Sequence, residues 1–464
     1  MRRWLDDPRL AAVRRWLDEH LFRDAPPAPE LTGRRAAVIA ALAVIGVAMQ
    51  LARVWASNPL ETLWTEDGSV WLQDAMTRGF GDALTTPYNG YLQTLGRLVA
   101  EPVAALPVEW FPATMALIGA AIVIGMAFLV WRASAAHIED PYLRGALAAL
   151  MVLLPTFGVE DLANVTNSIW FLLFASFWVL LWRPRSFGGA LLGAGVLFLA
   201  AVTNAGMVVL APLWAARLIA FRDRRDAAIV IAFAVGLAIQ LGISAGDTNL
   251  LSEEGRKQVV AEPNWEWEVV AAYAQRVIGG AFGGYEVSAY LWRELGGPFL
   301  VALALGLVGL VAVAVARGGR AAVLVAVAVA ASVAIFLTAG YRRWDFGGSA
   351  LYWPSGLSGR NATHHVIVPT LLLLSAVAVL LDSVARAGGA ETRLRMRAVM
   401  AGLVVVGLLS FDASDAIRSV PTWSEEVTAA RSACQRGGET ARLRIAPVRL
   451  FDKWVVETPC SKLE

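Results

Sequence analysis

The chain has 464 residues, of which 57% are hydrophobic and 17% are charged, and its formal net charge is +2. This composition excludes a water-soluble globular protein, because too few polar side chains remain to cover a surface in water. The near-neutral charge and the scattered arginines argue against a nucleic-acid partner. We therefore expect a polytopic membrane protein. The scarcity of lysine beside abundant arginine, alanine and valine is typical of a GC-rich bacterial genome.

Residues 1–34 are rich in charge and contain no apolar core of a cleavable signal peptide. Apolar side chains recur there at helical spacing, at Trp4, Leu5, Val13, Trp16, Leu17 and Leu21. This pattern predicts an amphipathic helix on the cytoplasmic membrane surface, and a short solvated helix fits it equally well.

Eleven apolar runs follow within residues 35–411, and most of them are long enough for a membrane helix. They cover roughly residues 35–57, 110–131, 143–158, 168–182, 187–203, 205–220, 228–245, 298–316, 321–339, 365–382 and 398–411. The fold class is therefore all-α and polytopic, with about eleven transmembrane helices.

Arginines gather in alternate turns between these runs, which indicates the orientation of the chain. If the N-terminus is cytoplasmic, every short cytoplasmic turn is basic, as the positive-inside rule requires. The same orientation puts the long loops at 58–109, 246–297 and 340–364, the short loop at 159–167 and the tail 412–464 on the extracytoplasmic face of the inner membrane. We expect the chemistry on that face.

Both cysteines, Cys434 and Cys460, lie in the tail. An extracytoplasmic tail is in an oxidising compartment, so a single disulfide is the simplest interpretation, and two unpaired small residues are the alternative. The segment between the cysteines alternates apolar and polar residues on either side of Pro447, which favours strands. The tail is therefore predicted to be a small, stapled cap that contains β-structure.

Two adjacent carboxylates, Glu66 and Asp67, directly follow the first apolar run. Carboxylates this close repel each other, which can raise one pKa and produce a general base or a metal ligand. Alternatively, Asp67 or Thr65 caps the next helix while Glu66 is merely solvated. Apolar residues later in the loop suit helices that lie along the membrane surface, and Tyr88 is counted there as a substrate-binding residue.

In this position and context, Glu66 and Asp67 resemble the acidic residues of the GT-C glycosyltransferases, integral membrane enzymes that take sugars from polyprenyl-phosphate carriers. The resemblance implies a GT-C-like architecture with horizontal helices in the first outer loop. It also implies that Asp67 or Glu66 deprotonates the acceptor hydroxyl or orients a divalent cation such as Mg²⁺ or Mn²⁺. Which residue does so stays open.

The outer segment 340–364 combines arginines with aromatic residues. Arg342, Arg343 and Arg360 can bind the phosphate of a lipid carrier, and Trp344 can stack on a sugar ring. An aromatic belt at the membrane surface with snorkelling arginines is the alternative.

A polar cluster stands between two membrane helices in the loop at 159–167, formed by Glu160, Asp161, Asn164 and Asn167. Polar groups at that depth are costly unless they are used or paired. The cluster is interpreted as a second wall of the sugar site, or as a helix cap with polar packing. His364, at the start of a later helix, is a possible metal ligand together with Glu66 and Asp67.

Together these features predict an enzyme that moves a sugar from a polyprenyl-phosphate carrier to a glycan, lipid or protein acceptor of the cell envelope. One alternative is an O-antigen-type polymerase or ligase. Another is a non-enzymatic transporter or flippase of lipid-linked glycans, although the apolar runs contain almost none of the charges expected within the spans of a transporter.

Overall fold

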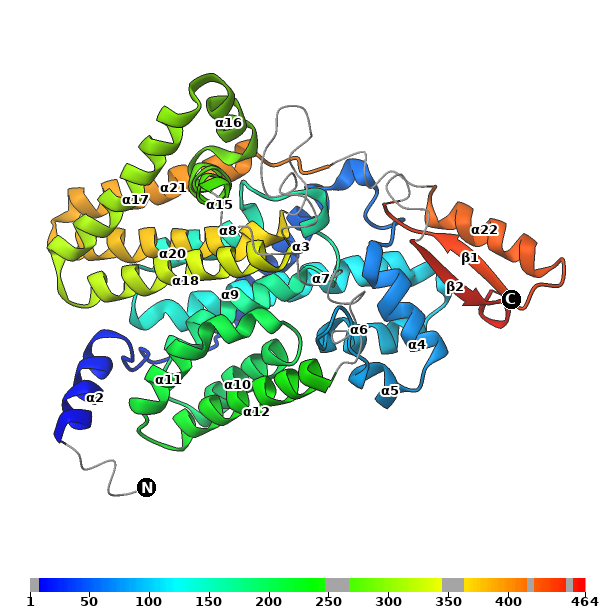
Figure 1. Ribbon diagram of the computed structural model, residues 1–464, viewed down its shortest axis with the longest axis horizontal. Coiled ribbons are helices and arrows are strands. Elements are labelled where there is room, and N and C mark those ends of the chain that lie inside the picture. Colours follow the sequence, from blue (N-terminus) through cyan, green and yellow to red (C-terminus); the bar gives the residue numbers. More distant parts are fainter. Residues whose placement is uncertain (1–7, 247–266, 344–362, 415–420, 448–453, 464) are drawn as a thin grey trace.

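The computed structural model describes residues 8–246, 267–343, 363–414, 421–447 and 454–463. A helical bundle makes up most of it (Figure 1). The N-terminal helix lies at one end of the bundle, and the C-terminal cap lies at the opposite end, next to the helices of the first long loop.

Six helices of the described chain are long and apolar enough to cross a membrane. They are α3 (Gly33–Ala52), α7 (Phe111–Ala133), α12 (Arg224–Gly246), α17 (Gly297–Arg317), α18 (Gly319–Arg343) and α20 (His364–Ala387). The other helices of the bundle are α8 (Pro141–Leu153), α9 (Ser168–Leu181), α10 (Phe187–Ala201), α11 (Ala211–Ile219) and α21 (Ala390–Leu409). Each of the eleven apolar runs coincides with one of these helices, whereas eleven membrane crossings remain a prediction.

The centre of the bundle is built around α9 and α20. Nearly every side chain of α9 is buried, as expected for a helix that is apolar on all sides. The two helices pack against each other, and the Trp178 indole N–H donates a hydrogen bond to the Ser375 hydroxyl at 3.3 Å. This rigid centre supports the polar loop that precedes α9.

The first long loop folds into short helices at one end of the bundle (Figure 1). They are the π-helix η2 (Asp67–Leu72), α4 (Gln73–Thr77), α5 (Phe80–Thr85), α6 (Thr94–Ala104) and η3 (Val108–Trp110), and the short helix η1 (Trp55–Ser57) directly precedes the loop. Trp71 is fully buried against Gly96, and Arg97 forms an ion pair with Asp74 at 2.5 Å. The loop is therefore a packed unit, and its orientation relative to a membrane remains a prediction.

Further helical elements connect the helices of the bundle. They are η4 (Ser134–Ala136), η5 (Val159–Asp161), η6 (Ala205–Leu210), α15 (Trp267–Ala272), the π-helix η7 (Tyr273–Gly279) and α16 (Gly280–Leu295). Of these, η5 and η6 matter most here, because both lie beside the cavity described below.

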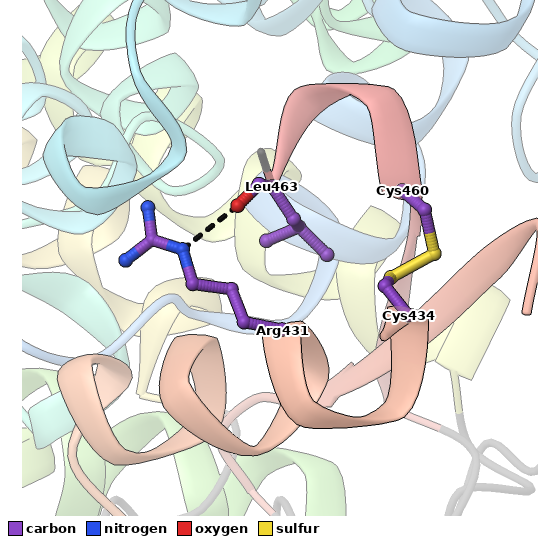
Figure 2. Close-up of a disulfide and its surroundings, with 4 residues drawn as sticks. All are labelled: Arg431, Cys434, Cys460 and Leu463. Atoms are coloured by element: carbon purple, nitrogen blue, oxygen red, sulfur yellow. Dashed lines mark hydrogen bonds between the residues drawn. A yellow bond between two sulfur atoms is a disulfide. The ribbon is translucent and has the colours of Figure 1, made fainter. Parts of the chain in front are cut away.

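The C-terminal cap consists of α22 (Trp423–Cys434), the antiparallel strands β1 (Thr440–Arg444) and β2 (Val455–Pro459), and the turn η10 (Cys460–Lys462). The predicted disulfide is confirmed, because Cys434 and Cys460 are bonded. Figure 2 shows this bond beside the hydrogen bond that Arg431 Nε donates to the Leu463 carbonyl at 2.8 Å. The predicted strands are also present on either side of Pro447.

The N-terminal helix α2 (Pro8–His20) is fastened to the bundle. Asp18 forms an ion pair with Arg183 at 2.6 Å, and Phe22, just after the helix, is completely buried. Trp16 on the outer face is 46% exposed. One side of the helix is thus used for packing, and contact of the other side with lipid remains a prediction.

Candidate active site

A cavity of about 270 Å³ lies where the first long loop, the loop before α9, η6 and the ends of α18 and α20 meet. The polar residues that line it include Glu66, Glu160, Asn89, Gln93, Asn167 and Asn204. The aromatic residues include Trp64, Tyr91, Trp170 and His364, and the apolar residues include Ile169, Leu173, Val209 and Ile335. Small-molecule sites measure roughly 300–1,000 Å³, so this one suits a single sugar ring better than a glycan chain.

Glu66 is the carboxylate of the predicted pair that lines this cavity. One of its oxygens accepts a hydrogen bond from the neighbouring Thr65 hydroxyl, and the other accepts one from the Tyr88 phenol at 3.2 Å. An ionised carboxylate has about four acceptor sites, so these two bonds orient the group without using its full capacity. Glu66 therefore presents an oriented carboxylate to the cavity.

Asp67 is turned away from the cavity and is only 1% exposed. It accepts hydrogen bonds from the backbone N–H groups of Val165 and Thr166, at 2.9 and 2.8 Å, and from the Thr166 hydroxyl at 2.7 Å. Burial raises the pKa of Asp67 to about 6, although the bonds from Thr166 and Val165 oppose this shift. The side chain ties the first long loop to the loop before α9.

Glu160 enters the cavity from that second loop and contacts the start of α20. Its Oε1 accepts a hydrogen bond from the Thr363 hydroxyl at 2.9 Å and lies 3.1 Å from His364 Nδ1. Burial opposes ionisation, but His364 and the bonds from Thr363 outweigh it and hold the pKa of Glu160 below its usual value.

Asp161 lies next to Glu160 and is 2% exposed. Its Oδ2 accepts a hydrogen bond from the Gly158 N–H at 2.8 Å, whereas its buried Oδ1 has no hydrogen-bond partner among the described residues. Burial and the charge of Glu160 raise the pKa of Asp161. A carboxylate oxygen in this situation suits a cation better than it suits an apolar contact.

Glu160, Asp161 and His364 could hold that cation together, since one ligand atom from each lies within 4.8 Å of the others. Two carboxylates suit Mg²⁺ or Mn²⁺, and an imidazole suits the softer divalent ions. Of the three metal ligands predicted from the sequence, His364 is the one in this cluster; Glu66 and Asp67 are not part of it.

The two predicted asparagines mainly shape the loop. The side-chain amides of Asn164 and Asn167 both donate to the Glu160 carbonyl at 2.7 Å, and Asn164 Oδ1 accepts from the Asn167 N–H at 2.8 Å. Asn167 also accepts from the Trp170 indole N–H at 3.2 Å and lines the cavity. Tyr88, predicted as a substrate contact, holds Glu66 instead of lining the cavity.

Four predicted phosphate or sugar contacts cannot be placed in this site. Arg360 and Trp344 lie outside the described residues, and the side chains of Arg342 and Arg343, at the end of α18, also lie outside the description. Their roles remain predictions.

Sequence reasoning missed several residues at or near the cavity, and Asn204 and Arg276 are two of them. Asn204 lines the cavity from the start of η6. The sequence feature that could have identified it is its position as an isolated polar residue within an apolar stretch. Arg276, in η7, is 2% exposed, and Glu160 and Asp161 are among its nearest charges. Burial lowers the pKa of Arg276 to about 10, so the side chain stays cationic at neutral pH. Nothing in the sequence around Arg276 distinguishes it from other loop arginines.

Neither a protein-family model nor a curated protein sequence matches the chain. Among solved structures, ArnT from Cupriavidus metallidurans bound to undecaprenyl phosphate is similar, with 11% identity and a TM-score of 0.38 over 82% of this chain and 76% of that one. The oligosaccharyltransferase of Archaeoglobus fulgidus, in complex with Zn and sulfate, is 14% identical with a TM-score of 0.38, over 85% of this chain and 55% of that one. Likenesses at this level carry no argument about activity.

Proposed function

We propose that the protein is a membrane glycosyltransferase that moves a sugar from a polyprenyl-phosphate carrier to a cell-envelope acceptor on the extracytoplasmic face of the inner membrane. The observation that carries this proposal is the position of Glu66, an oriented carboxylate on the wall of a cavity of sugar size. Aromatic rings and side-chain amides on the other walls are the groups that bind sugar hydroxyls and ring faces.

In the proposed reaction, Glu66 accepts the proton of the acceptor hydroxyl while the acceptor oxygen forms a bond to the anomeric carbon. The bond between that carbon and the phosphate oxygen breaks, and the lipid phosphate leaves as a stable anion that needs no acid. Arg342, Arg343 and Arg360 are proposed to stabilise this anion. Asp67 takes no proton in this scheme, because its hydrogen bonds hold the loop in place.

Glu160, Asp161 and His364 would hold a divalent cation if one takes part, and its charge would neutralise phosphate oxygens. Without an ion, Glu160 stays paired with His364 and forms the second acidic wall of the cavity. In both cases Trp170, which stacks on His364 with ring centroids 5.6 Å apart, offers an aromatic surface to the sugar.

The test is sugar transfer in membranes from radiolabelled undecaprenyl-phosphate-linked glucose, mannose, galactose and arabinose, with wild type, Glu66→Gln and Asp67→Asn at matched protein levels. We expect Glu66→Gln to lower the turnover rate about 100-fold or more, because it removes the base. Asp67→Asn should lower transfer less than Glu66→Gln does. Repeating the assay with a chelator, and then with Mn²⁺ restored, shows whether an ion takes part.

Transfer that is equal in wild type and Glu66→Gln would contradict the assignment of the base. If wild type transfers no sugar from any of these donors, the polymerase, ligase and flippase alternatives become the better explanations.

A further inference from the structure

The segment that carries Glu66 is held by the C-terminal cap as well as by the bundle. Trp64 and Ala446 form an isolated parallel β-bridge. The Thr65 N–H donates to the Ala446 carbonyl at 2.9 Å, and the Ala446 N–H donates to the Leu63 carbonyl at 3.0 Å. The backbone on the N-terminal side of Glu66 is therefore paired with the cap.

The cap also fills the space beside Gly68, two residues after Glu66. A Cβ atom at Gly68 would lie 2.8 Å from Ile445 Cδ1 and 2.8 Å from Val456 Cγ2. Both Ile445 and Val456 are completely buried. Gly68 and the cap thus pack together without room for one added methyl group. Because the packing is this close, a displacement of the cap is transmitted to the segment that carries Glu66.

The cap also contacts the first long loop at points outside residues 63–68. The Trp423 indole N–H donates to the Val108 carbonyl at 2.7 Å, and the Trp423 backbone N–H donates to the Glu61 carbonyl at 2.9 Å. Lys462 Nζ donates to the Ala104 carbonyl at 2.5 Å. The cap therefore holds both the start and the end of the loop that carries Glu66.

Two internal links make the cap rigid. Arg444 pairs with the buried Glu426 at 2.6 Å and joins β1 to α22. The Cys434–Cys460 disulfide joins the end of α22 to the residue that follows β2 (Figure 2). Val456, which packs on Gly68, belongs to β2.

We propose that the cap is a positioning element for Glu66: its contacts at Ala446, Ile445 and Val456 set where the carboxylate stands at the cavity wall. This inference rests on the proposed function, in which Glu66 is the base. Ile445, Ala446 and Val456 do not line the cavity, so they act through the backbone of the segment.

Gly68→Ala tests the inference, with Gly81→Ala as the matched control in the same loop, where a Cβ would meet nothing within 4 Å. We expect Gly68→Ala to lower kcat about 10- to 100-fold, while KM for the lipid-linked donor changes little, because a small misplacement of a catalytic group mainly affects the transition state. In the Glu66→Gln background, Gly68→Ala should cause no further loss, since the group that it displaces is already absent. Unchanged kcat in Gly68→Ala, or losses that multiply in the double variant, would overturn the inference.

Hydrogen exchange of the purified full-length protein supplies a readout that does not depend on transfer. Peptides covering residues 61–69 and 440–447 should be protected in wild type and Gly81→Ala. They should exchange about tenfold faster in Gly68→Ala and in the double variant Cys434→Ser/Cys460→Ser. Equal exchange in all four proteins would overturn the positioning role whatever the activity. If exchange changes as expected but wild type transfers no sugar, the proposed function fails while the contact between cap and segment is supported.

Discussion

Glu66 and Asp67 are neighbours in the sequence, but their surroundings in the fold differ. Glu66 lines the cavity, whereas Asp67 is buried and accepts three hydrogen bonds from Val165 and Thr166. Different environments are a general way to give two carboxylates different tasks. The sequence could identify the pair, but it could not show which carboxylate lines the cavity, because Val165 and Thr166, about a hundred positions away, hold Asp67 away from it.

Burial of Asp67 predicts a specific pH dependence of stability. Its pKa rises from 3.8 to about 6 on folding. Between pH 3.8 and about pH 6, Asp67 is protonated in the folded protein but ionised in the unfolded chain. The stability that this group contributes is therefore fully present below about pH 4 and is lost as the pH rises through 6. The free energy of unfolding changes by about 3 kcal/mol at most through this group.

Thermal unfolding in detergent checks this expectation. When the pH is raised from 4.5 to 7, the melting temperature of wild type should fall relative to that of Asp67→Asn. The variant has no titrating group at position 67, so it does not lose this contribution to stability. Parallel curves for the two proteins would show that Asp67 keeps an ordinary pKa in the fold.

Close packing of α7 against the loop before α9 predicts a second effect, at the scale of an element. A Cβ at Gly119 would lie 2.3 Å from the Asn164 carbonyl oxygen. Gly119→Ala should therefore push away the loop that carries Glu160 and cost about 1–3 kcal/mol of stability, with a clear loss of transfer. Gly125→Ala is the control in the same helix, since its Cβ would meet nothing within 4 Å. Equal melting temperatures and activities in both variants would refute this role of the contact.

The elements themselves were largely predictable, because their signals are local. All eleven apolar runs coincide with helices, and the alternating residues around Pro447 form β1 and β2. The cavity was less predictable, since it joins residues as distant as Trp64, Asn204 and His365. Periodicity reports which face of an element is buried, but it does not report which elements meet.

At the scale of the molecule, α2 and the cap lie at opposite ends of the bundle (Figure 1). This arrangement suits the predicted topology, with the N-terminus cytoplasmic and the cap outside. Every short turn that this topology puts inside is basic.

Cysteine labelling tests that topology. In intact spheroplasts treated with a membrane-impermeant reductant, an impermeant maleimide should label Cys434 and Cys460. In a Cys434→Ser/Cys460→Ser background, Gly188→Cys should react only after lysis, because Gly188 stands at the predicted cytoplasmic end of α10 and a Cβ there would meet nothing within 4 Å. The reverse pattern would invert the predicted orientation.

The bridge between Trp64 and Ala446 also has a consequence for biosynthesis. The Glu66 segment is translated before the helices of the bundle that follow it, and the strands that pair with it and pack on it are translated after all of those helices. During this interval the helices can already enter the membrane, while the segment still lacks its partner. Membrane insertion and the pairing of this segment with the cap are therefore separate events, and the pairing has to wait until the cap has been made.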